Sequence, residues 1–229
     1  MKKILSALIL TTSIVIFAQE SKENKWILKL NTTQLVDDFS FPTVMFSAER
    51  IINPYFSVSA EAGIQLYETT KSDSTILKPR GFKTNLEGRF YISKFFHKRV
   101  QPKRNEPFIG LQFFYRKNQK TDGIYYYPIN DDTFENGQGE TFGVKKRALG
   151  VNLILGNQFS LSKSGRFILE PYAGIGYMNR KIKNTNLRFD ETKYEIDKGF
   201  YNFSSQNNTE GDSGDFVNFI IGFRIGYRL

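Results

Sequence analysis

Large apolar side chains occupy every second position at the end of the chain, in the stretch DFVNFIIGFRIGYRL (215–229). The positions between them carry mainly glycine, asparagine and arginine. Strict alternation over this length is typical of a β-strand with two unlike faces. The chain must therefore build a sheet, and the composition of the two faces decides which of them is the inner one.

The same alternation recurs upstream. The segments are 25–33, 43–50, 55–68, 81–92, 107–118, 148–159 and 166–180. With the last strand they make about eight strands of roughly ten residues, the length that crosses a bilayer at a tilt. The pattern predicts an all-β fold, a transmembrane antiparallel up-and-down β-barrel.

The polar face of these segments has the character of a filled barrel interior. It combines glycine and small residues with a few charges, and an eight-stranded barrel has an interior just wide enough for side chains. Buried charges need partners, and each sign is present four times. We therefore predict an interior ion-pair network of Lys29, Glu49, Glu61, Glu87, Arg89, Arg116, Glu170 and Arg224. The apolar face then lies outside, against lipid; the alternative is a soluble lipocalin-like barrel, whose pattern would be the reverse.

The first residues predict export. Lys2 and Lys3 precede an apolar run that closes on the small residue Ala18, which is the pattern of a secretory signal peptide. We expect cleavage after Ala18 or Gln19, so that residues 1–18 form the signal peptide and residues 19–229 the barrel. The chain has no cysteine, which excludes disulfides and thiolate metal sites.

The links between the predicted strands alternate between short and long. Short links lie at 52–55 and 160–166, and long polar links at 69–80, 117–141 and 182–215. Membrane barrels have short periplasmic turns and long outer loops, so this phase places both termini in the periplasm. One basic link, 93–107, breaks the pattern because it is long and predicted to be periplasmic.

The mature chain resembles the small outer-membrane β-barrels of the OmpA/OmpX type, in particular the "outer membrane protein beta-barrel domain" proteins of uncharacterised function. The signal peptide, the strand count, the loop phase and the ending FIIGFRIGYRL carry this resemblance. The ending is similar to the C-terminal strand signal that the barrel-assembly machinery reads, although it closes on Leu229 with the aromatic at Tyr227. The resemblance implies a monomer in the cell outer membrane that this machinery inserts.

Enzymatic chemistry is not expected. A Ser/His lipase or an omptin-like protease needs a histidine near the outer rim, and the only histidine, His97, lies in the basic link predicted to be periplasmic. The interior carboxylates are interpreted as ion-pair partners, and we expect no catalytic residue, cofactor or metal site. The hypothesis is a non-enzymatic barrel with a filled polar interior and a structural or surface-interaction role, in envelope integrity or adhesion. A lipid A-modifying barrel enzyme and a small-solute pore remain the alternatives.

Basic residues gather near the predicted outer ends of the strands. The mature chain is basic, since the formal charge of +9 falls to +7 without Lys2 and Lys3, which favours anionic head groups or polysaccharide over nucleic acid in an exported protein. A ring of cations at this height can hold the phosphates of lipopolysaccharide. The candidates are Lys117, Lys145, Lys146, Arg147, Arg180 and Lys181. The expected partners are therefore outer-membrane lipid and lipopolysaccharide, with a further surface partner that the sequence does not identify.

Overall fold

A computed structural model describes residues 26–37, 40–65, 76–92, 105–129, 136–162, 164–196 and 208–229. Its strands are β1 (Trp26–Asn31), β2 (Val44–Ile51), β3 (Phe56–Ile64), β4 (Arg80–Tyr91), β5 (Asn105–Pro128), β6 (Gln138–Ser160), β7 (Phe167–Thr185), β8 (Tyr194–Ile196) and β9 (Gly214–Arg228). Two short 3-10 helices, η1 (Thr33–Val36) and η2 (Glu210–Asp212), accompany them. The predicted signal peptide and the basic link around His97 lie outside the described residues.

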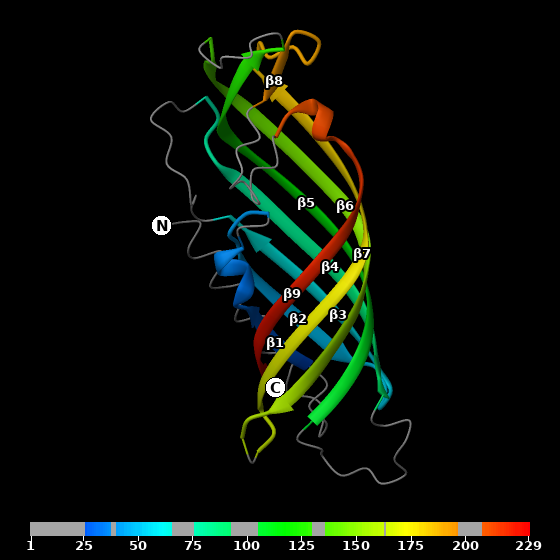
Figure 1. Cartoon of the computed structure of the whole chain (residues 1–229). Coiled ribbons are helices and arrows are strands. Elements are labelled where there is room, and N and C mark those ends of the chain that lie inside the picture. The colour runs from blue at the N-terminus through cyan, green and yellow to red at the C-terminus, as the bar shows by residue number, and fades with distance from the viewer. Residues whose placement is uncertain are drawn as a thin grey trace, which may run out of the picture.

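Eight of the strands form a closed antiparallel ring (Figure 1). Each of β1 to β6 pairs with the next strand along the chain, β7 pairs with β9, and β9 pairs with β1. The short β8 lies beside the end of β5, where Tyr126 to Pro128 pair with it. The predicted all-β, up-and-down barrel of about eight strands is therefore confirmed.

The strands differ greatly in length. The alternation predicts strand ends near Asn118, Ala148 and Arg180, but the ladders continue outward to Pro128, Gln138 and Thr185. Regular cross-strand pairing persists there although the apolar-outward pattern does not: Phe142, Val144 and Ile182 are buried, while Lys145 and Lys181 are exposed. The alternation used to find the strands therefore missed these extensions. As a result β5, β6 and β7 rise well above β1, β2 and β3, which stop near mid-height in Figure 1.

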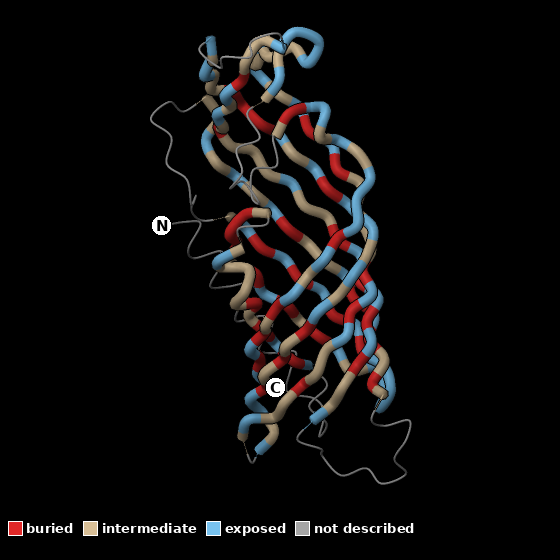
Figure 2. The backbone as a smooth tube through the Cα atoms, in the orientation of Figure 1, coloured by how far each residue is buried: buried red, intermediate tan, exposed pale blue. Residues whose placement is uncertain are grey.

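The polar face of the strands is the inner one. Buried and exposed residues alternate along the strands (Figure 2), and the buried set includes charged side chains such as Glu49, Arg89 and Arg224. Large apolar residues such as Phe113 and Leu153 are about half exposed on the outer surface. The barrel thus has a polar core and an apolar exterior, the reverse of a water-soluble fold.

Aromatic residues complete the packing of the lumen. Tyr91, Phe108, Ile154 and Tyr172 form a buried cluster. Gly222 on β9 makes room for it, because a Cβ there would lie 2.1 Å from Cζ of Tyr172. Among the described residues there is no helix with the length and apolar character needed to cross a bilayer.

Candidate functional site

A network of ion pairs fills the lumen at the barrel end that holds the C-terminus. Arg89 of β4 lies at its centre: Nη1 is 2.9 Å from Glu49 Oε2 and 3.0 Å from Glu170 Oε2, while Nε is 2.8 Å from Glu87 Oε1. All four side chains are fully enclosed. The guanidinium therefore joins carboxylates from β2, β4 and β7 across the interior.

Arg224 of β9 extends the network from the opposite wall. Its Nε is 2.6 Å from Glu61 Oε1, its Nη1 2.6 Å from Glu170 Oε1 and its Nη2 3.1 Å from Glu87 Oε2. Glu170 is also its cross-strand neighbour in the β7–β9 ladder. The guanidinium lies 3.9 Å from the centroid of the Tyr172 ring, which covers its remaining face.

Lys29 and several neutral donors complete the network. Lys29 Nζ lies 2.5 Å from Glu49 Oε2 and also contacts Glu170. The hydroxyl of Tyr91 donates to Glu49, and the Gln158 amide donates to Glu49 and Glu170 at 2.9 Å each. Three cations thus face four carboxylates, and hydroxyl and amide donors supply further hydrogen bonds to the surplus negative charge.

Arg116, the eighth residue predicted for this network, lies elsewhere. It points inward from β5, but nearer the outer end of the barrel, where its guanidinium is 4.5 Å from the centroid of the Phe114 ring. It forms no ion pair with a carboxylate in the part of the chain that the structure describes. The alternation gave its face correctly, whereas its height above the network depends on the register of the sheet.

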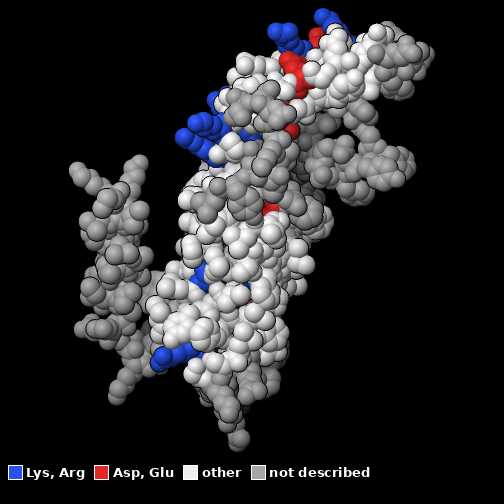
Figure 3. All heavy atoms as spheres, turned by 90° about the vertical axis from the view of Figure 1, so that its left-hand side faces the viewer, with Lys and Arg blue, Asp and Glu red and all other residues white. Residues whose placement is uncertain are grey.

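The six residues predicted for the outer basic rim divide between two faces. Lys117, Lys145, Arg147 and Lys181 are exposed on the exterior. Lys117 is the ladder partner of Arg147, and Arg147 is the partner of Lys181, so these three cations form one row across β5, β6 and β7. Lys145 lies in the next row outward, opposite Lys183. Figure 3 shows Lys and Arg gathered toward the upper end of one face of the barrel.

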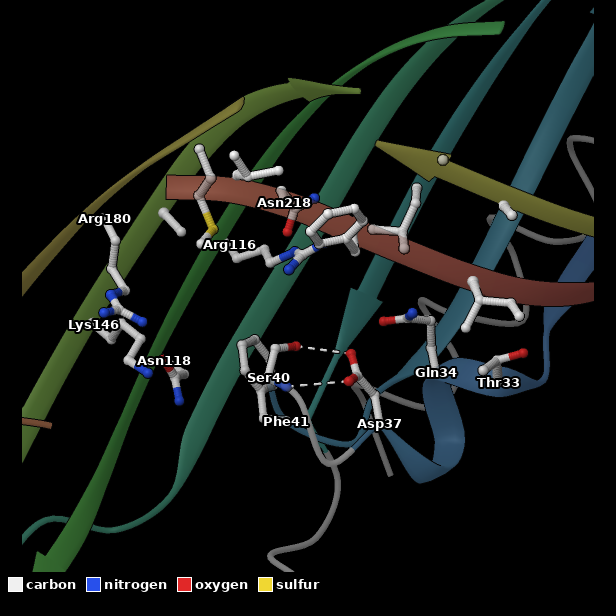
Figure 4. Close-up of a pocket in the computed structure, with 18 of the residues that line it drawn as sticks. Thr33, Gln34, Asp37, Ser40, Phe41, Arg116, Asn118, Lys146, Arg180 and Asn218 are labelled. Carbon is white, nitrogen blue, oxygen red and sulfur yellow. Dashed lines mark hydrogen bonds between the residues drawn. The ribbon is translucent and has the colours of Figure 1, made fainter. Parts of the chain in front are cut away.

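The other two, Lys146 and Arg180, lie next to Arg147 on β6 and Lys181 on β7, but their side chains face inward. They line a pocket of about 600 Å³ at the side of the barrel. Arg116, Asn118 and Asn218 share this inner wall, as Figure 4 shows. Residues that are adjacent in sequence, such as Lys145 and Lys146, therefore lie on opposite faces of the sheet, one on the exterior and one in the pocket.

The opposite wall of the pocket is the segment that follows β1. Asp37 accepts hydrogen bonds from the Ser40 amide at 3.1 Å and the Ser40 hydroxyl at 2.8 Å (Figure 4). Lys83 Nζ reaches Asp37, the Gln34 side chain and the Phe41 carbonyl, each at 2.7 Å. Burial acts to raise the pKa of Asp37, but the Lys83 ammonium and the Ser40 hydrogen bond outweigh it and hold that pKa below its ordinary value.

The pocket opens because β1 is too short to cover β9. The β1–β9 ladder ends where Asn31 meets Arg224, with one further bond from the Thr32 amide to the Phe223 carbonyl. Beyond it, β9 continues to Gly214 beside β7 alone. The ring is thus closed at the end that holds the C-terminus. Farther from that end, no described strand pairs with this edge of β9.

Sequence reasoning missed this pocket. A usable signal was present, because the alternation stops after Asn31 and does not resume until Val44, leaving a first strand much shorter than the last. No group of three potential metal ligands occurs among the described residues.

Comparison with known proteins adds no assignment to this geometry. No family model matches the chain, and no curated protein matches it in a sequence search.

Proposed function

We propose that this chain is an integral, non-enzymatic β-barrel of the outer membrane, with a lumen closed to solutes and an outer basic face that binds the phosphates of lipopolysaccharide. Its role would then be structural or surface-interacting, in envelope integrity or adhesion. The observation that carries the proposal is the inversion of burial. Arg89, Arg224 and their carboxylate partners are enclosed, while Phe113 and Leu153 are exposed, and only a lipid solvent favours that arrangement.

The two ends of the apolar exterior support a membrane position. Trp26, Tyr55 and Tyr227 are partly exposed at the end that holds the C-terminus, where an aromatic girdle is expected. At the other end the row Lys117, Arg147 and Lys181 follows directly on exposed Leu149. An apolar band between aromatic and basic boundaries is the exterior that a bilayer requires.

The basic row has the spacing that phosphate binding needs. Neighbouring strands lie about 5 Å apart, so three cations in one ladder row can contact the same or adjacent phosphates. Such charge-assisted contacts are strong and depend on salt. In the Gram-negative outer leaflet the corresponding ligand is the phosphorylated head of lipopolysaccharide.

Refolding tests the membrane part of the proposal. The mature chain is expected to refold from urea into detergent micelles or vesicles, and to migrate differently on gels with and without boiling, since a closed barrel resists unfolding. Planar bilayers should show no stable large conductance, because side chains fill the lumen. A soluble, detergent-independent fold would refute the membrane location, and a stable open channel would favour the pore alternative.

Binding to lipopolysaccharide tests the outer basic face. We expect the refolded protein to bind lipopolysaccharide in a salt-sensitive manner. The variant Lys117→Gln/Arg147→Gln/Lys181→Gln should lose most of this binding, while Arg166→Gln, which removes an exposed cation at the opposite end of the barrel, should retain it. Equal binding by the triple variant and the parent would remove lipopolysaccharide from the proposal but leave the barrel in place.

A further inference from the structure

We propose that the side pocket binds one anionic amphiphile, with a carboxylate or phosphate head group against Arg116 and Lys146 and an acyl chain along Phe219 and Ile221 of β9. Entry from the outer leaflet rests on the membrane location proposed above. The charged wall and the apolar mouth of the pocket are independent of it.

The inner wall of the pocket carries two cations, Arg116 and Lys146, that form no ion pair within the described chain. Arg116, Lys146 and Arg180 line it, and Asp37 is the one carboxylate among the lining residues that the structure describes. Asp37 is already engaged by Lys83 at 2.7 Å. Lys146 forms no hydrogen bond or ion pair with the described chain. Partly enclosed cations that form no ion pair are costly, and an anion bound beside Arg116 and Lys146 would offset that cost.

Arg180 holds the geometry of this wall. Its Nη2 donates to the Asp212 carbonyl at 2.7 Å and its Nε donates to the same oxygen at 3.0 Å. These bonds fix its guanidinium beside Lys146 (Figure 4). Arg and Lys together recognise carboxylate and phosphate oxygens, which are the head groups of anionic amphiphiles.

The mouth of the pocket is apolar. Phe219 and Ile221 are each 74% exposed and Val36 is 70% exposed, the highest values for large apolar residues in the described part of the chain. All three line the pocket. Because they lie on either side of the open seam, an acyl chain placed there would cover the surface that β1 leaves bare.

The backbone of β9 offers further donors to the same ligand. The backbone carbonyl of Phe223 points toward β1, whereas the backbone amide of Arg228 donates to the Arg166 carbonyl at the opposite edge of β9. By the alternation of strand hydrogen bonds, the amides of Val217, Phe219 and Ile221 therefore point into the seam, where no described residue pairs with them. Unpaired backbone at membrane depth is tolerated only where it lines a cavity or meets a polar partner. Head-group oxygens are such partners.

The height of the opening fits this ligand. Gly214 of β9 is the ladder partner of Arg180, and Arg180 precedes Lys181 of the outer basic row. The charged wall is therefore level with the basic boundary of the barrel, and Phe219 and Ile221 lie below it, beside the apolar band. A volume of about 600 Å³ is in the range of small-molecule sites.

The test is native mass spectrometry of the refolded protein with three probes of one chain length and one without a chain. The probes are laurate, dodecyl phosphate, the uncharged dodecanol and inorganic phosphate. We expect one bound laurate or dodecyl phosphate per chain, with the tighter of the two identifying the head group. Dodecanol and inorganic phosphate should each bind at least roughly tenfold more weakly, because each lacks one half of the contacts.

Two matched variants locate the site. Arg116→Gln/Lys146→Gln should weaken binding by about 10-fold to 100-fold, as expected for the loss of charge-assisted contacts. Lys117→Gln/Arg147→Gln removes the same charge from the outer face and should leave binding unchanged. If the first variant fails to fold, Lys146→Gln alone serves, because its amine has no hydrogen-bond or ion-pair partner among the described residues to lose.

Several outcomes would overturn the proposal. Equal affinity for dodecanol would remove the role of the cations, and equal affinity for inorganic phosphate would remove that of the apolar mouth. Unchanged binding by the pocket variant would place the ligand elsewhere. These results are separate from failure of the membrane location, which would appear as a soluble fold and would still permit the binding measurement.

Discussion

At the scale of single residues, the barrel is held by charges that water would ordinarily solvate. Arg224 is the clearest case, because it contacts Glu61, Glu87 and Glu170 and no water-exposed surface. Glu87 and Glu170 also pair with Arg89. Glu61 has no other cation within ion-pair distance in the described chain, and only the Asn85 amide, at 2.6 Å, supports it further.

This difference gives a prediction for Arg224→Met. The change should lower the free energy of unfolding by about 3–5 kcal/mol, because it leaves buried carboxylates without their cation. Adding Glu61→Gln should recover a large part of the loss, whereas adding Glu170→Gln should recover less, since Glu170 keeps Lys29 and Arg89. The measurement is the urea midpoint of each refolded variant in vesicles.

The control is Lys145→Met, which removes an exposed cation and should change stability by less than about 0.5 kcal/mol. A silent Arg224→Met variant, or equal recovery by the two double variants, would contradict the network as described.

The residues of this network could be chosen from the sequence because side chains alternate between the two faces of a strand, so that a residue's position shows whether it faces the lumen. Their partners could not, because pairing across the lumen depends on the register of eight strands. Arg116 illustrates the limit. Like Arg89 and Arg224, it occupies an inward-facing position in its strand, yet it lies beside the pocket and forms no ion pair with the described carboxylates.

At the scale of elements, the decisive feature is the mismatch between the first and last strands. β1 pairs with β9 only from Ile27 to Asn31, so in the described chain the rest of β9, toward Gly214, has a neighbouring strand, β7, on one side only. The short β1 is readable from the sequence, but the consequence is not, because it depends on how far β9 extends beyond the ladder.

Amide exchange along β9 should show this mismatch residue by residue. We expect the amides of Asn218, Ile220 and Gly222, which face β7, to exchange slowly, and those of Phe219 and Ile221 to exchange much faster. Hydrogen exchange followed by NMR on the micelle-bound barrel measures it. Uniform protection along this stretch would mean that another segment covers the edge and would remove the open seam.

The segment after β1 carries a pH-dependent anchor. The pKa of Asp37 is lowered from its ordinary value of 3.8 in the folded protein, so its contribution to stability is present above that value and is lost as the pH falls through the lower folded pKa. The Thr43 amide, which donates to the Gln34 carbonyl, reports on this segment. Its protection should be constant at neutral and mildly acidic pH and fall below about pH 4.

Asp37→Asn provides the matched comparison for this anchor. The variant should show weaker protection of Thr43 throughout and no step in the acid range. A step that persists in the variant would assign the acid transition to another carboxyl group.

At the scale of the whole molecule, the fold class was predictable because the alternation of outward apolar and inward polar residues recurs in segment after segment of the sequence. The tall wall of β5, β6 and β7 was not, because the pattern changes there: Phe142, Val144 and Ile182 are buried, whereas Lys145, Lys181 and Lys183 are exposed. The side pocket was also not predictable, because it combines residues from β5, β6, β7, β9 and the segment after β1. If the chain lies in the outer membrane as proposed, its surface partner depends on this part of the barrel, and fold alone does not decide that partner.

The most direct measurement of the central claim is the depth of outward residues of β6 in a bilayer. The chain has no cysteine, so single-cysteine variants at Arg147, Leu149, Leu153 and Leu155 can each carry one environment-sensitive fluorophore. In vesicles with lipids brominated at mid-chain, the labels at Leu149, Leu153 and Leu155 should have blue-shifted emission and be quenched, most strongly near the middle of this stretch. The label at Arg147 should remain in a head-group or aqueous environment. Water-like emission without quenching at all four positions would contradict a barrel whose apolar face is solvated by lipid.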